Sequence, residues 1–162
     1  MTGPYPYPAN ITKITEALFN RIVAGVAGAP YSVLSDGETV LLEEDVYYGD
    51  QSRLPHATAV CLEPSDKDRV LSGAPNMTTN DFTIFILVYV QLVQDVQQTR
   101  KDADNLAYDI EHWLHQDLQL SGTLIHGFVS RAESGFTFKQ NTLYRSSRMT
   151  YSGRNKTSLP VA

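Results

Sequence analysis

The sequence has few of the features that mark disulfide-linked, secreted or membrane-spanning proteins. Its single cysteine, Cys61, cannot form an internal disulfide, so a disulfide framework is excluded. Residues 1–8 lack the basic region and apolar core of a signal peptide. The most apolar stretch, residues 82–93, is shorter than the ~20 residues that a membrane-spanning helix needs. We therefore expect a soluble, non-secreted protein.

Positive charge is also scarce. The chain has 13 lysines and arginines against 18 acidic residues, a formal net charge of -5. This balance argues against a protein that binds nucleic acid or an anionic membrane over its whole surface. With 162 residues and 42% hydrophobic residues, the chain is long enough to bury the core of one domain.

Two hydrophobic periods meet between residues 81 and 118. Residues 81–93 are rich in β-branched and aromatic side chains and become almost continuously apolar, which predicts a long central strand that is covered on both faces over at least part of its length. Apolar residues then recur at spacings of three and four, which predicts an amphipathic helix over 99–118. The apolar positions are Ala103, Leu106, Ala107, Ile110, Trp113 and Leu114. Thr99 and Asp102 resemble a helix start.

The N-terminal third predicts a helix between an arm and two short strands. Residues 1–9, with three prolines, predict an extended arm, and Asn10 or Thr12 can cap a helix over 11–27. Two short strands over 31–42 follow, joined by the turn Ser35-Asp36-Gly37-Glu38.

The segments on either side of the central strand predict shorter elements. We expect a short buried strand at 57–62 and a long loop over 63–80. After the second helix, residues 123–144 predict a hairpin that turns at Glu133-Ser134-Gly135, and residues 145–152 predict a further strand. Residues 154–162 are expected to form a tail.

The order of these elements predicts a single α+β domain over residues 10–153. Helix, strands, long strand, helix and strands follow one another, which favours a mixed or mostly antiparallel β-sheet with two α-helices packed on one face. No internal repeat or low-complexity segment divides the chain.

Catalytic and metal-binding patterns are weak. His112 and His115 lie three apart on the expected helix and could share a metal ion, but no His-Glu-x-x-His pattern or distant ligand cluster accompanies them. His126 has only Ser121 and Ser130 nearby, without a Gly-x-Ser-x-Gly turn or an acidic partner. We therefore expect no catalytic residue, cofactor or metal ion. A small histidine-dependent hydrolase is the alternative from a different class.

Charge is distributed unevenly along the chain. Residues 36–50 hold six acidic side chains and no basic one, whereas residues 140–162 hold four basic side chains and no acidic one. If these regions lie on opposite flanks, the acidic surface of one subunit meets the basic surface of the next, and this head-to-tail contact builds a ring when its rotation closes. The alternatives are two solvated faces, or a monomeric module with a basic edge for nucleic acid. The residues of this hypothetical interface are Glu43, Glu44, Asp45, Tyr47, Tyr48, Arg145, Arg148 and Arg154.

The order of elements resembles that of the tail terminator and tail-completion (head–tail joining) proteins of tailed bacteriophages, of the lambda type. The likeness is one of pattern over most of the chain: an N-terminal helix, an early strand pair, a loop-rich middle, a long strand, a Trp-bearing helix and a final hairpin with a basic strand. The local stretches that look most similar are 103–110, followed by Trp113, and 144–151.

This resemblance implies a virion structural protein of the tail or neck, assembled in the host cytoplasm. Its members form a ring, here expected to be a hexamer, on the last ring of the tail tube protein, where they end tube growth and present a surface to the head-completion or connector protein. DNA passes through the lumen without specific binding, and no membrane, catalysis or cofactor is implied. The proline-rich start and the 63–80 segment depart from the pattern, so a terminator and another neck adaptor both remain open.

Overall fold

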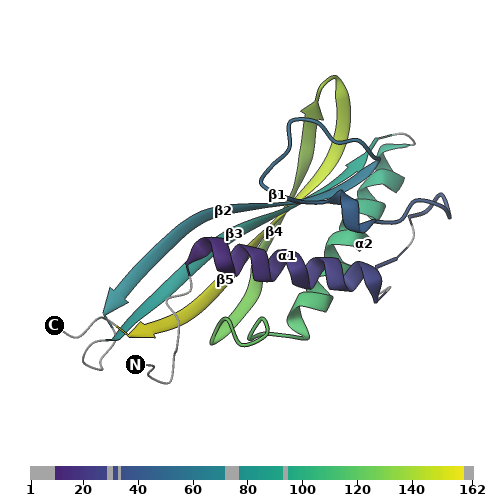
Figure 1. Cartoon of the computed structure of the whole chain (residues 1–162). Helices are drawn as coiled ribbons and strands as arrows, with labels where there is room; N and C mark the ends of the chain where they lie inside the picture. The colour runs from purple at the N-terminus through teal and green to yellow at the C-terminus, as the bar shows by residue number, and fades with distance from the viewer. Residues whose placement is uncertain (1–9, 29–30, 33, 72–76, 93–94, 159–162) are drawn as a thin grey trace.

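The computed structural model describes residues 10–28, 31–32, 34–71, 77–92 and 95–158. These residues form two α-helices, one short 3-10 helix and a five-stranded sheet (Figure 1). In chain order the elements are α1 (Ile11–Ala27), η1 (Glu43–Asp45), β1 (Val46–Tyr48), β2 (Thr58–Leu71), β3 (Met77–Gln91), α2 (Val96–His115), β4 (His126–Lys139) and β5 (Thr142–Ser158).

The sheet has the order β1-β2-β3-β5-β4, so β3 lies at its centre as the sequence predicts. Only β1 and β2 are parallel; the pairs β2–β3, β3–β5 and β4–β5 are antiparallel. Both helices lie on the same side of the sheet (Figure 1). The predicted α+β fold, with a mixed sheet and two helices on one face, is confirmed.

Helix α1 forms where the sequence predicts it. The side chain of Asn10 accepts a hydrogen bond from the backbone N–H of Lys13 at 2.8 Å and so caps the first turn. Ile14, Leu18 and Ile22 form one stripe and are fully buried. Burying each of these side chains stabilises the fold by roughly 1.5–3 kcal/mol.

Helix α2 begins earlier than the sequence suggests. Asp95 is the N-cap and accepts a hydrogen bond from the backbone N–H of Gln98 at 2.8 Å, whereas Thr99 lies inside the helix and donates its hydroxyl to the Asp95 carbonyl. The expected start at Thr99 and Asp102 is therefore wrong. The helix begins after Asp95 because the Asp95 carboxylate accepts a hydrogen bond in the first turn, where the backbone N–H groups have no partner within the helix.

Two apolar clusters cover the two faces of β3. Ile84, Ile86 and Val88 point toward the helices and are fully buried in the main core. On the opposite face, Tyr89 packs in a smaller cluster with Cys61 and its neighbours. The prediction that the central strand is covered on both faces is thus confirmed for this part of β3, and the alternation follows from the two-residue period of a strand.

The described residues of 31–42 form a turn and extended backbone and contain no strand, so the predicted strand pair is wrong. The turn itself is present, because the backbone N–H of Leu34 donates to the Thr39 carbonyl at 2.9 Å. The carboxylate of Asp36 accepts hydrogen bonds from the backbone of Glu38 and Thr39. These local bonds satisfy the backbone without a neighbouring strand.

The predicted loop over 63–80 is also wrong. Strand β2 continues to Leu71 and β3 begins at Met77, so the two form one long antiparallel pair. The register shifts between Pro64 and Asp66. Such a β-bulge accommodates a proline, which has no N–H to donate to the ladder.

The last hairpin turns at Gln140 and Asn141, which corrects the expected turn at residues 133–135. Both residues have positive φ, 48° and 65°, which is typical of a two-residue hairpin turn. Strand β5 then runs to Ser158, so residues 154–158 belong to the sheet and the expected tail does not start there. The expected N-terminal arm lies outside the described residues.

Candidate subunit interface

Strand β4 forms one edge of the sheet, and the start of this edge is covered by the end of α2 and the residues that follow it. The backbone N–H of Gly127 donates to the Leu118 carbonyl at 2.6 Å, and that of Val129 donates to His115 Nε2 at 3.0 Å. Both N–H groups point away from β5 and are satisfied. The first part of β4 is therefore closed to further strand pairing.

The remainder of the edge, residues 131–139, is open; we name it the open edge of β4. It begins after a register shift between Val129 and Arg131 and ends at the two-residue turn, where Lys139 pairs with Thr142. The pair that closes such a turn is hydrogen-bonded, so every second residue before it directs its backbone away from β5. These outward residues are Ala132, Ser134, Phe136 and Phe138. In the part of the chain that the structure describes, no strand pairs with this side.

Two aromatic side chains lie exposed along the open edge of β4. Phe136 is 51% exposed and Phe138 is 72% exposed. The guanidinium of Arg145 lies 4.4 Å from the Phe136 ring centroid and donates to Ser134 Oγ at 2.6 Å. Arg145 of β5 thus holds β4 through contacts within one subunit. The rings of Phe136 and Phe138 remain largely exposed to solvent.

A second open edge lies on the opposite side of the sheet. Strand β1 pairs only with Val60, Cys61 and Leu62 of β2. Beyond them, residues 63–71 of β2 pair with β3 on one side, and no described strand lies on the other. We name residues 63–71 the open edge of β2.

The acidic residues proposed for the interface divide into exposed and buried ones. Glu43 and Glu44 are exposed on η1, but Asp45 is only 1% exposed. Asp45 Oδ1 lies 2.6 Å from His56 Nδ1, and its Oδ2 accepts the backbone N–H of Leu42 at 3.0 Å. Asp45 therefore does not belong to an exposed contact surface. Its hydrogen bond raises the pKa of His56 above the usual range.

The two tyrosines proposed for the interface lie on β1 with different exposure. Tyr48 is exposed, whereas Tyr47 is partly buried and packs against the cluster that holds Cys61. Burial raises the pKa of the Cys61 thiol to about 11, so this thiol is a poor nucleophile at neutral pH.

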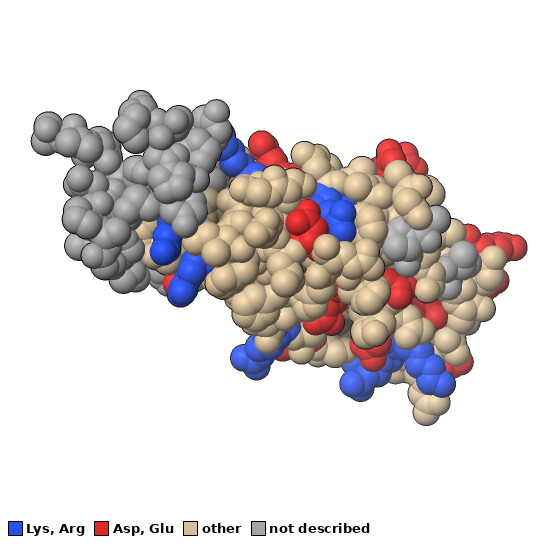
Figure 2. Space-filling view, turned by 90° about the horizontal axis from the view of Figure 1, so that it is seen from below, with Lys and Arg blue, Asp and Glu red and all other residues tan. Residues whose placement is uncertain are grey.

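The proposed arginines already have partners in their own chain. Arg148 donates to Glu133 at 3.1 Å, and Arg154 donates to both carboxylate oxygens of Asp81, at 2.7 and 3.2 Å. The bonds from Arg154 hold the pKa of Asp81 below its usual value. Arg145 is 7% exposed and so is not a free surface charge. Figure 2 shows basic and acidic side chains interspersed over the face seen from below, rather than one region of each sign.

One ion pair joins the acidic segment to the C-terminal hairpin within the chain. Lys139 Nζ lies 2.9 Å from Asp50 Oδ1, and the Tyr89 hydroxyl donates to the same oxygen at 2.9 Å. The ammonium also lies 4.8 Å from the Tyr89 ring centroid. Asp50, one of the six residues of the acidic segment, is therefore paired inside one subunit by a lysine that precedes the basic segment, which leaves it less available for a contact between subunits.

The histidines considered for catalysis do not share a site. His115 accepts the backbone N–H of Val129, His112 stacks on Tyr108, and His126 lies beside Phe128. Among the described residues, no group of three or more histidines, cysteines and acidic residues is placed to hold a metal ion.

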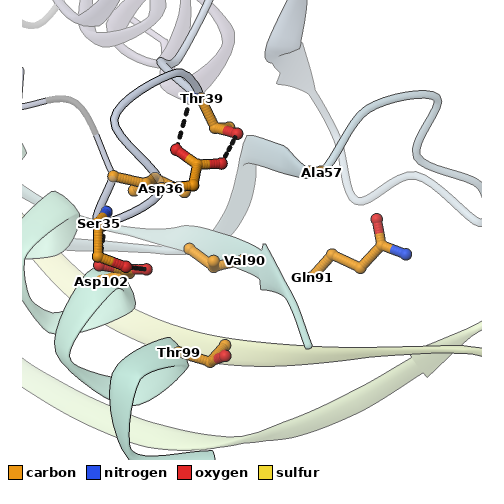
Figure 3. A pocket seen from close by; sticks show the side chains of 9 residues that line it. Ser35, Asp36, Thr39, Ala57, Val90, Gln91, Thr99 and Asp102 are labelled. Carbon is orange, nitrogen blue, oxygen red and sulfur yellow. Dashed lines mark hydrogen bonds between the residues drawn. The ribbon is translucent and has the colours of Figure 1, made fainter. Parts of the chain in front are cut away.

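A shallow pocket lies between the 34–39 turn, the end of β3 and the first turns of α2 (Figure 3). Its two carboxylates are already engaged. Asp36 accepts the hydroxyl and the backbone N–H of Thr39, and Asp102 accepts the hydroxyl of Ser35 at 2.8 Å. Both carboxylates thus serve the local structure: Asp36 closes the turn, and Asp102 ties the turn to α2.

No protein-family model matches the chain, and no curated protein shows significant similarity to it. Neither helix of the described chain is both long and apolar enough to cross a membrane. The function must therefore be argued from the geometry of the two sheet edges. Sequence reasoning missed the open edge of β4, although the alternation of Phe136 and Phe138 with polar neighbours was a signal for a strand with one apolar face.

Proposed function

We propose that this chain is a ring-forming virion structural protein of the phage tail terminator type, which caps the tail tube and joins it to the head connector. The observation that carries the proposal is the open edge of β4, with Phe136 and Phe138 exposed beside it. It supports the assembly part of the proposal directly. The phage part rests on the resemblance in element order.

An edge of this kind favours self-assembly for a physical reason. Unpaired backbone N–H and C=O groups along a long edge are a template for another strand, and monomeric proteins block them with prolines, further bulges or a covering element. The open edge of β4 has no proline, and its only register shift comes before it, at Val129 and Arg131. Exposed aromatic rings beside it add apolar area that a second subunit would bury.

The fold and the charge pattern agree with this role. The β4–β5 hairpin projects beyond the helices at one end of the molecule, where it can reach a neighbour (Figure 1). Basic residues on the open face of the sheet are neutralised, Arg148 by Glu133 and Arg154 by Asp81. A lumen lined by such paired charges would let DNA pass without holding its phosphates.

The first test is the mass of the purified protein over a range of concentrations, by light scattering on a sizing column. We expect a species near six times the 18.0 kDa chain, or a monomer that purified tail tubes recruit to one end. Recruitment by the connector but not by the tube would assign the chain to the neck adaptors instead. A monomer that neither the tube nor the connector binds would refute the proposal.

A further inference from the structure

We infer that the open edge of β4 pairs with the open edge of β2 in a second copy of this chain, and that the two strands run antiparallel. This inference rests on the proposed self-assembly and assigns the strands that form the contact. The two open edges lie on opposite sides of one sheet, so each copy offers one edge to either neighbour. A contact between two different edges is heterologous and therefore continues from copy to copy until it closes.

The two edges differ in how continuous they are. The open edge of β4 covers residues 131–139, and the open edge of β2 covers residues 63–71. Near its start the β2 edge is interrupted by Pro64, which has no N–H to donate, and by the register shift between Pro64 and Asp66. A partner strand would therefore meet continuous backbone over residues 66–71 of β2 and residues 131–139 of β4.

The strand directions also match. Strand β2 is antiparallel to β3, β3 to β5, and β5 to β4, so β2 and β4 run in opposite directions in one sheet. A second copy that continues the sheet beyond β4 would place its β2 antiparallel to β4. Antiparallel pairing needs no crossover and forms the more stable ladder per residue.

The open edges lie at opposite ends of the sheet, as Figure 1 shows for the β4–β5 hairpin and the far end of β2. Following the register across the sheet, Gly135 lies opposite Ser146, Ser146 opposite Tyr89, and Tyr89 opposite Ala59. The open edge of β2 starts only at Glu63, farther along its strand. Each copy would therefore be shifted along the strand direction relative to its neighbour. When a sheet with such a shift closes into a ring, its strands are tilted relative to the ring axis.

The competing arrangement is a two-fold dimer in which the β4 edges of two copies pair with each other. That contact would also be antiparallel, but it would leave both β2 edges open. Pairing β4 with β2 covers both of the open edges named above in a closed ring, so it removes more unsatisfied backbone per subunit than the two-fold contact does.

Single cysteines on the two edges distinguish these arrangements. Ser65→Cys lies on the exposed start of the open edge of β2. Gly135→Cys lies on the open edge of β4, where an added Cβ meets only Ser146 Oγ, at an ordinary 3.7 Å. Cys61 is fully buried and stays unreactive in the folded protein. Tyr108→Cys, on the exposed side of α2, is the control for chance cross-linking.

The folded variants are treated with a short bismaleimide, singly and as an equal mixture, at the concentration where the mass shows assembly. We expect a cross-linked dimer in the mixture of Ser65→Cys with Gly135→Cys, and a ladder of multimers from the double variant. A dimer from Gly135→Cys alone would overturn the inference in favour of the two-fold contact.

The remaining outcomes separate this inference from the proposed function. Assembled protein without the mixed cross-link would refute the strand pairing while self-assembly stands. If the protein assembles only on tail tubes, the cross-linking is done on the tubes and the same outcomes apply. A protein that stays monomeric, is bound by neither the tube nor the connector and gives no mixed cross-link would refute both. Cross-linking of Tyr108→Cys to the same extent as the mixture would show that the signal is unspecific and would also overturn the inference.

Discussion

Arg21 of α1 and Trp113 of α2 bind each other through three contacts. The guanidinium of Arg21 lies 3.7 Å from the Trp113 ring centroid and donates to the Trp113 carbonyl at 3.0 Å. In return, the indole Nε1 of Trp113 donates to the Arg21 carbonyl at 2.7 Å. The pair fixes the two helices against each other near their C-terminal ends, on the covered side of the sheet.

A double-mutant cycle should isolate the cation–π contact between these residues. Trp113→Leu removes the ring and its Nε1 donor, and Arg21→Met keeps much of the stem but removes the guanidinium. Each hydrogen bond goes to a backbone carbonyl and is lost in its own single variant, so it cancels in the cycle. We expect a coupling free energy of about 0.5–1 kcal/mol from urea unfolding of the four proteins, which measures the cation–π contact. Arg100→Met, whose partner Asp104 is exposed, should change stability by about 0.5 kcal/mol or less. Coupling near zero would contradict this account.

Phe138→Asp should prevent assembly without unfolding the subunit. The side chain is 72% exposed in the single chain, so a charge there costs little in the monomer but would be buried in a contact along the open edge of β4. We expect the assembled species on the sizing column to disappear while the circular dichroism spectrum stays the same. Tyr108→Asp, at a side chain 65% exposed on α2, is the matched control and should still assemble. Equal behaviour of the two variants would rule out the edge.

Charge reversal should separate Arg145 from Arg148. Arg145 is buried against Phe136 and Ser134, so Arg145→Glu places an unpaired carboxylate in the hairpin and should destabilise the subunit by roughly 2–4 kcal/mol. Arg148 is exposed and pairs with Glu133, so Arg148→Glu should cost about 1 kcal/mol or less. Urea unfolding of both variants measures the difference. Similar losses would mean that the hairpin does not depend on the Arg145 contacts.

The contact of His56 with Asp45 predicts a pH-dependent stability. The pKa of His56 is raised in the folded protein, first by its hydrogen bond to Asp45. Its contribution is therefore fully present below the unfolded pKa of about 6.5 and is lost as the pH rises through the higher folded pKa. Urea unfolding of the wild type and His56→Gln should differ most at pH 5.5 and converge by pH 8.5. His112→Gln is the control, and a difference that grows with pH would have the wrong sign.

Gly127 and Gly135 lie on the same strand but should respond differently to alanine. A Cβ at Gly127 would lie 2.2 Å from Tyr151 Oη and 2.8 Å from Leu124 Cδ1, both inside the fold. Gly127→Ala should therefore cost about 1–3 kcal/mol through overpacking. Gly135→Ala meets only an ordinary contact with Ser146 and should be neutral or stabilising by about 0.5 kcal/mol. The midpoints of thermal unfolding compare the two variants, and an equal loss in both would contradict the packing seen at Gly127.

The helices were predictable because their signals are local. Asn10 and the spacing of Ile14, Leu18 and Ile22 specify α1 within a few turns of chain. The far half of β2 carries no such signal, because its charged run and Pro64 do not alternate with apolar residues. That segment is a strand because β3 lies beside it, and pairing with a neighbour overrides weak local preference.

The hairpin turn shows the same limit. Gly135 attracts a turn prediction since glycine adopts positive φ readily, yet the turn falls at Gln140 and Asn141. Partners for charged side chains were equally hidden, because Lys139 and Asp50 meet across 89 residues of sequence. Counting charges along the chain therefore located the acidic and basic segments but not which of them remain free at the surface.

The pairing of β3 with β5 has a consequence for the order of folding. The ladder runs from Met77–Ser158 to Gln91–Tyr144, although α2 and β4 separate the two strands in sequence. The hairpins β2–β3 and β4–β5 can each form from nearby residues, but their union must close a long stretch of chain, which makes it the slow step. A chain halted before that union would display β3 and β5 as two further unpaired strands at the middle of the future sheet.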